Sequence, residues 1–363
     1  MNPDRKTRVA VNGYGVIGKR VADAVALQDD MELAGVADIG IDWRPRMATQ
    51  KGYRLFAATA EHGRAMRDAG LAVAGELDEL LGAADVVVDC TPKRVAASNV
   101  ALYRGRGVKF IVQGGEKHEV TGHSFVAEVS YATALDREST RVVSCNTTSV
   151  VRTLGALKRA GLLRRARGTL LRRATDPWES HLGGIMNTLV PEPEIPSHQG
   201  PDARSVDPDL DVITMAVKVP ETLAHLHYWS VQLTREAGRD EVLEAFRSSS
   251  RIALIRMDAG LTALNTVKEM MADLGRPHDN LYEVALWADM LTVQGDELFY
   301  AYMVDNQAIV IPETIDAIRA LTGSTRDRDT SITATDAVLG VGLASGSLAA
   351  PRLGRGSTAA GER

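Results

Sequence analysis

The stretch RVAVNGYGVIGKRVADAV (residues 8–25) decides the fold of this chain. Its valine-rich start predicts a strand, and apolar residues at helical spacing predict a helix over 17–28. Between the two elements, Gly13, Gly15 and Gly18 form the pattern G-x-G-x-x-G. Glycines at this spacing permit a tight turn and a close approach of the backbone to a pyrophosphate, which the N-terminus of the following helix also attracts. The stretch therefore predicts a dinucleotide-binding strand–turn–helix unit.

An acidic residue follows at the spacing that such a unit requires. The run MELAGVAD (31–38) predicts a second strand, and Asp38 at its end lies twenty positions beyond Gly18. A carboxylate there can accept a hydrogen bond from a ribose 2′-hydroxyl. The alternative is a structural cluster of glycines that binds no nucleotide, but the strand, the helix and the acid together favour nucleotide binding.

The rest of the chain predicts an α/β fold with two kinds of sheet. Short apolar runs at 86–88 and 110–112 are typical of strands buried on both faces, and their alternation with helices predicts a Rossmann-type, doubly wound parallel sheet. After a predicted helix over 147–160 and a Pro- and Gly-rich passage, β-rich runs follow at 212–219 and 226–233. Because few helices separate these runs, they predict a second domain of α+β type with a mainly antiparallel sheet.

Helix signals return near the C-terminus. Pro312 is a favourable first helical residue, and the residues from Thr333 to Asp336 have the spacing of a helix start. We expect these helices to pack back on the first domain. The predicted division is a dinucleotide-binding domain of residues 1–144 and 306–344, a second domain of residues 145–305, and a disordered tail of residues 345–363.

Composition excludes several classes of protein. The 363 residues suffice for about two domains, and 45% apolar with 25% charged residues are ordinary globular values. Forty-two Lys and Arg against 47 Asp and Glu leave a net charge of −5, too acidic for a surface built around nucleic-acid phosphates. Two cysteines exclude a disulfide framework and favour the cytoplasm. No apolar run approaches the roughly 20 residues of a membrane helix, so we expect no membrane partner. The net charge likewise leads us to expect no nucleic-acid partner.

Cys145 lies where a predicted strand runs into a predicted helix, in VVSCNTT (142–148). The positive end of a helix dipole favours a thiolate, and Asn146 with the following backbone amides can donate to an oxyanion on a bound carbonyl. A free cysteine is usually a small buried apolar side chain, so position alone leaves a nucleophile and a packing residue equally open. Cys90 ends a strand with no candidate base near it in the sequence, and we expect it to pack.

Two histidines in a strand-like run are candidates for acid–base chemistry. His225 and His227 are two positions apart, so both side chains lie on one face of the strand. No Cys, His or Asp spacing elsewhere completes a metal site with them, and we expect no metal. One histidine then serves the cysteine as acid–base partner, and the other packs or hydrogen-bonds nearby. His198 lies in a proline-rich loop that can reach a substrate, and Arg172 with Arg173 suit a phosphate or carboxylate unless they are a solvated pair.

Seven segments in one order carry a resemblance that covers roughly residues 8 to 342. The segments are VNGYGVIGKRVADAV (11–25), QGGEK (113–117), RVVSCNTT (141–148), LRRATDP (171–177), PSHQGPD (196–202), LAHLHYW (223–229) and IVIPETIDAIRA (309–320). In these seven segments the chain resembles the archaeal-type (class II) glyceraldehyde-3-phosphate dehydrogenases.

The resemblance implies a cytoplasmic, homotetrameric enzyme of glycolysis or gluconeogenesis. It would oxidise D-glyceraldehyde 3-phosphate with NAD or NADP and inorganic phosphate to 1,3-bisphosphoglycerate, in a catalytic domain of residues 145–305. Cys145 corresponds to the nucleophile that forms a thiohemiacetal and then a thioester, and His225 to the base. The resemblance implies substrate or phosphate contacts for Ser144, Asn146, Thr147, Arg172, His198 and Gln199, and cofactor contacts for Val16, Ile17, Gly115, Arg173 and Asn306.

Five positions depart from the family pattern. Asp38 and Ile39 stand where the family typically has Lys-Thr, whose lysine favours the 2′-phosphate of NADP. A carboxylate repels that phosphate and favours NAD, although Arg44 and Arg46 keep NADP open. The identity of the substrate and its phosphate contacts are less constrained because of three further departures, which are Gln199 for a second histidine, Asn306 for glutamine and Gly184 for proline.

Two alternative functions remain at this point. A related dehydrogenase of erythrose 4-phosphate or of a semialdehyde shares the cysteine–thioester chemistry and differs in substrate. A catalytically silent NAD-binding protein with Cys145 as a redox-sensing thiol belongs to a different class. The combination of Cys145, Asn146, His225 and two arginines disfavours the second alternative, because a sensing thiol needs neither a base nor phosphate ligands.

Overall fold

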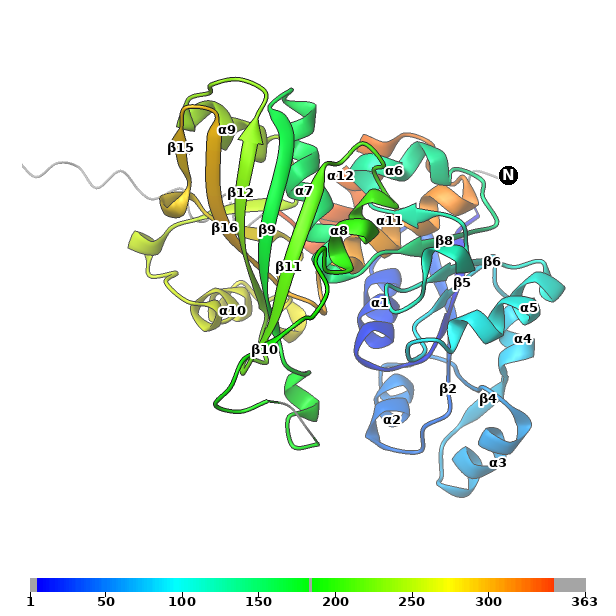
Figure 1. Cartoon of the computed structure of the whole chain (residues 1–363). Helices are drawn as coiled ribbons and strands as arrows, with labels where there is room; N and C mark the ends of the chain where they lie inside the picture. The colour runs from blue at the N-terminus through cyan, green and yellow to red at the C-terminus, as the bar shows by residue number, and fades with distance from the viewer. Residues whose placement is uncertain (1–4, 183–184, 343–363) are drawn as a thin grey trace, which may run out of the picture.

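The computed structural model describes residues 5–182 and 185–342, so the predicted tail at 345–363 and Gly184 lie outside the described residues. Two eight-stranded sheets lie side by side, and helices pack against both (Figure 1). Residues 7–142 supply the strands of the first sheet and residues 163–304 those of the second. Among the described residues, none of the helices has the length and apolar character that crossing a bilayer requires.

The first sheet is parallel throughout, which confirms the Rossmann-type, doubly wound sheet predicted from the sequence. Its strands are β1 (Thr7–Asn12), β2 (Met31–Asp38), β3 (Leu55–Ala57), β4 (Val73–Glu76), β5 (Val86–Asp89), β6 (Lys109–Val112), β7 (Ser124–Phe125) and β8 (Ser139–Val142). They are ordered β4-β3-β2-β1-β5-β6-β8-β7. The helices between them are α1 (Val16–Ala26), α2 (Trp43–Gln50), α3 (Ala60–Asp68), α4 (Leu77–Gly82), α5 (Ala96–Arg106) and α6 (Ala127–Ala134). All residues of β5 are buried, as its continuous apolar run predicts.

The second sheet is mixed, with most of its strand pairs antiparallel. Its strands are β9 (Leu163–Arg173), β10 (Val190–Pro191), β11 (Val212–Val219), β12 (His225–Leu233), β13 (Ile252–Ile255), β14 (Val284–Trp287), β15 (Thr292–Gln294) and β16 (Glu297–Val304). The pairs β9–β11 and β13–β14 are parallel. The accompanying helices are α7 (Cys145–Arg159), α8 (Gln199–Arg204), α9 (Arg239–Arg247) and α10 (Leu264–Asp273).

The two faces of this sheet differ in burial. Along β12, His225, His227 and Trp229 point inward and are buried, while Tyr228 between them is 43% exposed. In the view of Figure 1 no helix crosses in front of β9, β11 and β12. The inward face therefore carries the core and the site residues, and the outward face is left uncovered.

The C-terminal helices return to the first sheet, as the sequence predicts. Helix α11 (Val310–Thr322) packs against α1, α6 and β8, and α12 (Arg328–Leu339) packs against α11 and α6. Their starts differ from the prediction. Pro312 lies two residues inside α11, and α12 begins at Arg328 because Asp327 caps it by accepting the Thr330 N–H at 2.8 Å.

A buried network of charges joins the helices between the two sheets. Arg152 on α7 lies 2.6 Å from Glu313 on α11, and Arg251 before β13 lies 3.1 Å from the same carboxylate. Arg251 also lies 2.6 Å from Asp316 and 2.9 Å from Asp336 on α12. Because each buried charge has partners of opposite sign, the network fixes these elements relative to one another.

Candidate active site

The glycine-rich turn has the backbone that its sequence predicts. Gly13 has a φ of +92°, and a Cβ added there would lie 2.9 Å from the backbone of Cys90. A Cβ on Gly18 would lie 1.8 Å from the carbonyl oxygen of Gly13, so neither position accepts a side chain without displacement. Gly15 caps α1 and faces open space, which leaves the helix N-terminus accessible to a phosphate. Cys90 lies under the turn and packs against the core, as the sequence predicts.

Asp38 has a second task that the sequence analysis missed. Its carboxylate accepts hydrogen bonds from the backbone N–H groups of Tyr14 at 2.6 Å, Ile39 at 2.8 Å and Gly40 at 2.7 Å. The bond from Tyr14 joins the end of β2 to the glycine-rich turn, and the other two fix the backbone that follows β2. A carboxylate has about four acceptor positions, so one remains for a ribose hydroxyl.

Cys145 is the first residue of α7, at the junction with the first sheet. The helix begins two residues before the predicted start because the side chain of Ser144 caps it, accepting the Thr147 N–H at 3.3 Å. Burial raises the pKa of the Cys145 thiol to about 11, while the positive charges of Arg173 and Arg172 and the Asn146 N–H oppose this rise. The positive charges and the helix dipole are the features that favour the thiolate.

His225 is buried near the same two arginines. The backbone N–H of Arg173 donates to its Nδ1 at 3.0 Å, so the neutral ring carries its proton on Nε2. Burial, followed by the charges of His227, Arg173 and Arg172, lowers the pKa of His225 well below its usual range. His225 is therefore neutral and offers an N–H donor. This arrangement favours a hydrogen-bond donor over the base that the family resemblance implies.

The two arginines at the end of β9 are not equivalent. Arg173 donates to the carbonyl of Thr222 at 3.1 Å and to Asp176 at 2.6 Å, so its guanidinium is engaged within the protein. Arg172 pairs with Glu192, whose other carboxylate oxygen lies 3.8 Å from Nδ1 of His198. The Nε of Arg172 is buried and makes no hydrogen bond within residues 5–182 and 185–342. Of the pair, Arg172 is the one placed to receive an anion.

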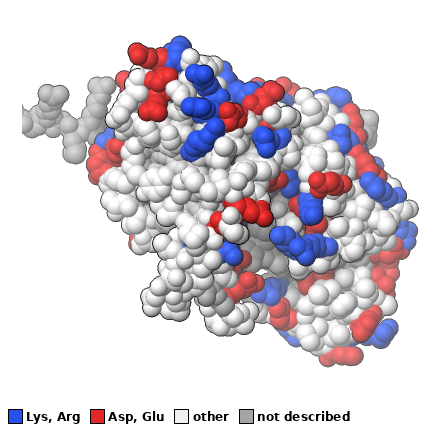
Figure 2. All heavy atoms as spheres, in the orientation of Figure 1, with Lys and Arg blue, Asp and Glu red and all other residues white. Residues whose placement is uncertain are grey.

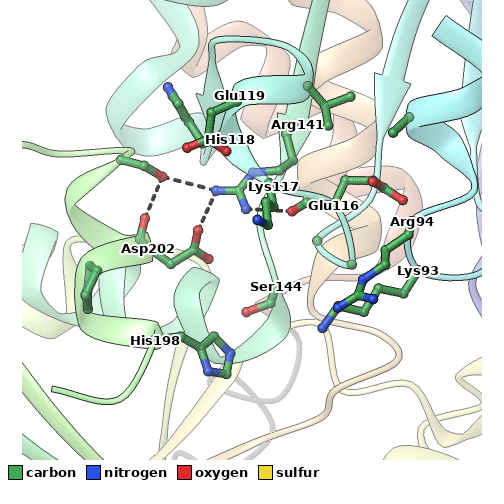
Figure 3. Close-up of a pocket in the computed structure, with 16 residues that line it drawn as sticks. Lys93, Arg94, Glu116, Lys117, His118, Glu119, Arg141, Ser144, His198 and Asp202 are labelled. Atoms are coloured by element: carbon green, nitrogen blue, oxygen red, sulfur yellow. Dashed lines mark hydrogen bonds and ion pairs between the residues drawn. The ribbon is translucent and has the colours of Figure 1, made fainter. Parts of the chain in front are cut away.

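A cavity of about 870 Å³ lies beside Ser144 and His198. Figure 3 shows Lys93 and Arg94 on one side of it and His198 on the other, with Gly115 also in the lining. Positive and negative side chains meet on this side of the molecule, next to a hollow between its two halves (Figure 2).

Asp202 lines this cavity and was not predicted as a site residue from the sequence. It accepts hydrogen bonds from Arg141 and, at 2.6 Å, from the Thr147 hydroxyl. Thr147 is fully buried. Its hydroxyl donates to Asp202 in this structure, and the phosphate contact that the family resemblance implies for Thr147 stays a prediction.

Two further predicted site residues have unpaired buried polar atoms. Neither amide atom of Gln199, which is fully buried, makes a hydrogen bond among the described residues, and the same holds for Oδ1 of Asn306. Buried polar groups normally have partners. Together with the accessible helix N-terminus at Gly15 and the remaining acceptor of Asp38, these orphaned atoms fit a polar ligand such as a nicotinamide dinucleotide.

Comparisons with known proteins agree with this geometry. Residues 144–279 match the family model "Glyceraldehyde 3-phosphate dehydrogenase, C-terminal domain", and residues 7–120 match "Dihydrodipicolinate reductase, N-terminus". The glyceraldehyde-3-phosphate dehydrogenase of Methanococcoides burtonii is 43% identical over 337 residues, 93% of this chain and 99% of the relative. That of Methanopyrus kandleri is 44% identical over 341 residues, 92% of this chain and 97% of the relative. The chain belongs to the archaeal-type glyceraldehyde-3-phosphate dehydrogenase family, whose members are NAD(P)-dependent oxidoreductases.

Proposed function

We propose that this chain is a phosphorylating glyceraldehyde-3-phosphate dehydrogenase. It converts D-glyceraldehyde 3-phosphate, phosphate and NAD(P)⁺ to 1,3-bisphosphoglycerate and NAD(P)H. The observation that supports this most is Cys145 at the start of α7, with Asn146 beside it and the charges of Arg172 and Arg173 near its sulfur. The full-length likeness to enzymes of this name supports the substrate.

The Cys145 thiol first loses its proton to solvent, and the resulting thiolate then adds to the aldehyde carbon. A carbon–sulfur bond forms, and the electron pair of the carbonyl becomes an alkoxide. The Nε2–H of His225 donates to this oxygen, and the amide of Asn146 supplies a second donor. The two donors stabilise the alkoxide that the addition forms. The alkoxide then expels hydride as the carbonyl re-forms, so hydride loss needs no base.

The cofactor, when bound, supplies the acceptor for the hydride lost from the substrate carbon. The chain contributes the turn at Gly13, Gly15 and Gly18, the carboxylate of Asp38 and the orphaned Oδ1 of Asn306. Oxidation leaves a thioester on the Cys145 sulfur.

Phosphate then attacks the thioester carbon. The new carbon–oxygen bond forms, the carbon–sulfur bond breaks, and the Cys145 thiolate leaves, while the proton of the phosphate passes to solvent. Arg172 and His198 hold the phosphate once it has displaced Glu192 from between them.

NAD is the preferred cofactor in this proposal. The carboxylate of Asp38 at the end of β2 would repel the 2′-phosphate of NADP. The two arginines that kept NADP open have other partners, since Arg44 lies 3.0 Å from Asp42 and Arg46 donates to the carbonyl of Ala69.

The oligomeric state, the cellular location and the roles of the two domains are also part of the proposal. The outward face of the second sheet exposes Met215, Tyr228 and Phe299, and Figure 2 shows few charged side chains over it. An uncovered apolar face of this kind supports the homotetramer. Both cysteines are free, which supports the cytoplasm. Residues 1–144 with 306–344 act as the dinucleotide-binding domain and 145–305 as the catalytic domain.

The test follows NAD(P)H absorbance with glyceraldehyde 3-phosphate, with and without phosphate, for wild type, Cys145→Ser and Cys90→Ser. We expect turnover that requires phosphate or arsenate, its loss in Cys145→Ser, and its retention in the matched variant Cys90→Ser. Unchanged turnover in Cys145→Ser contradicts the proposed nucleophile. Higher kcat/KM with erythrose 4-phosphate or a semialdehyde than with glyceraldehyde 3-phosphate contradicts the proposed substrate.

A further inference from the structure

His227, the second histidine of β12, is enclosed between Asn146 and Tyr302. Its Nε2 lies 2.9 Å from Oδ1 of Asn146, and its Nδ1 lies 3.0 Å from the hydroxyl oxygen of Tyr302. All three side chains are buried. The antiparallel register of β12 and β16 pairs His227 directly with Tyr302, so the sheet itself sets this contact. The three residues form a chain from the core of the second sheet to the neighbour of Cys145.

The distances along this chain favour one direction for its protons. Burial, followed by the charge of Arg172, lowers the pKa of His227 to about 3, so the ring is neutral and has one donor and one acceptor. Burial raises the pKa of Tyr302 far above neutrality, so its hydroxyl keeps its proton. The Ser149 hydroxyl donates its own proton to the backbone carbonyl oxygen of Asn146 at 2.8 Å. At 3.3 Å from the Tyr302 hydroxyl, Ser149 is therefore a more distant acceptor for the Tyr302 proton than Nδ1 of His227. Tyr302 therefore donates to the closer Nδ1, and the proton on Nε2 of His227 is donated to Oδ1 of Asn146.

This direction decides which end of the Asn146 amide is free. With Oδ1 held by His227, the amide nitrogen is the other end, and it makes no hydrogen bond within residues 5–182 and 185–342. An inverted amide would place two N–H groups against the Nε2–H of His227, which is repulsive. The buried chain thus presents an N–H donor, and not a carbonyl oxygen, on the side away from His227.

We propose that His227 and Tyr302 are positioning residues that orient the Asn146 amide, so that Nδ2 donates to the alkoxide formed on Cys145. The inference rests on the proposed function for the alkoxide. His227 and Tyr302 touch no reacting atom and act through Asn146 alone.

The experiment compares kcat, KM and melting temperature for His227→Phe, His227→Gln and Tyr302→Phe. His227→Phe removes the donor, and we expect kcat to fall about 10- to 100-fold with KM nearly unchanged, because an oxyanion donor acts in the transition state. His227→Gln keeps an N–H at the position of Nε2 and recovers most of kcat. Tyr302→Phe removes the hydroxyl that fixes the tautomer of His227, and we expect kcat to fall. Tyr300→Phe, on the same face of the same strand, is the control and is expected to leave kcat unchanged.

A double-mutant cycle separates positioning from general damage. If His227 acts only through Asn146, the double variant Asn146→Ala/His227→Phe loses no more kcat than Asn146→Ala alone. The alkylation rate of Cys145 by iodoacetamide stays at the wild-type value in each single variant, because the chain acts on the alkoxide and not on the thiolate. Additive losses, or wild-type kcat in His227→Phe, overturn the inference while leaving the proposed function intact.

The tautomer is also measurable without turnover. In protein labelled with ¹⁵N-histidine, the nitrogen chemical shifts of His227 are expected to show the proton on Nε2. A proton on Nδ1 overturns the inference, even if the wild-type protein oxidises no phosphorylated aldehyde and the proposed function itself fails.

Discussion

The carboxylate of Asp38 accepts a hydrogen bond from the glycine-rich turn, and the proposed function assigns it a second role as the acceptor for the adenosine ribose. Asp38→Asn removes the charge while keeping most of the shape. We expect the ratio of kcat/KM with NADP to that with NAD to rise about 10- to 100-fold, because a charged hydrogen bond to the ribose is lost together with the repulsion of a 2′-phosphate. Steady-state kinetics with both cofactors measure the ratio. An unchanged ratio contradicts the assignment of Asp38 to cofactor choice, whatever happens to the absolute rates.

Glu192 occupies the anion position between Arg172 and His198 in the protein without ligand. Glu192→Gln removes the competing charge, and we expect the KM for inorganic phosphate to fall roughly threefold to tenfold with kcat little changed. Glu194→Gln, two residues further along the same segment, is the matched control and is expected to behave as wild type. A higher KM for phosphate in Glu192→Gln means that Glu192 supports the site and does not compete with its ligand.

Single side chains were predictable from the sequence where local context carries the signal. The sequence predicted that Cys145 and Asn146 lie where a strand runs into a helix, and the structure confirms this position, while their catalytic roles stay predictions. One of the two histidines of β12 was expected to pack or hydrogen-bond near the cysteine, and His227 contacts Asn146. The tautomer of His225 was not predictable, since it depends on a backbone N–H of another strand. Asp202 and Glu192 were missed for the same reason, because their partners come from distant segments.

At the scale of elements, the contact between the glycine-rich turn and α1 is what forms the dinucleotide site. Gly18→Ala places a methyl group against the carbonyl of Gly13, so the turn must move away from the helix. We expect NAD affinity, measured by calorimetric titration, to weaken at least about tenfold while the far-ultraviolet circular dichroism stays that of wild type. The control Gly105→Ala, a helix position with nothing within 4 Å, should bind NAD normally. Equal affinity in both variants would contradict the assigned cradle.

The periodicity of apolar residues predicted which segments are helices and which are strands. It did not predict where the helices begin, because capping residues set their ends. The strand at 212–219 was predicted at its observed bounds, because alternating apolar residues define it. Helix α7 begins earlier than predicted, since the Ser144 cap adds residues that break the apolar pattern. Helix α12 begins at Arg328 and not near Thr333 for the same kind of reason, because Asp327 caps it.

At the scale of the whole molecule, the sequence predicted two sheets and assigned a type to each. The first is parallel as expected, and the second is mainly antiparallel as expected, with two parallel pairs that the sequence did not predict. The parallel pair β9–β11 arises because the long passage between them, which contains α8, returns the chain to the same edge in the same direction. Such a return depends on tertiary packing and leaves no periodic signal in the sequence.

The uncovered face of the second sheet is the proposed subunit contact. Tyr228→Glu places a charge in its centre, and we expect the tetramer to dissociate into smaller species, as measured by light scattering coupled to size-exclusion chromatography. Leu27→Glu, at an exposed apolar position at the end of α1, is the control and should leave the mass unchanged. A wild-type protein that is monomeric at micromolar concentration contradicts the tetramer directly.

The central claim is a covalent thioester on Cys145, and peptide mass spectrometry of the acid-quenched protein tests it most directly. Wild-type protein is mixed with glyceraldehyde 3-phosphate and NAD without phosphate, quenched in acid and digested. The account predicts a 3-phosphoglyceryl adduct on the peptide that contains Cys145, which disappears when phosphate is added before the quench. No adduct, or an adduct on the peptide of Cys90, would contradict it.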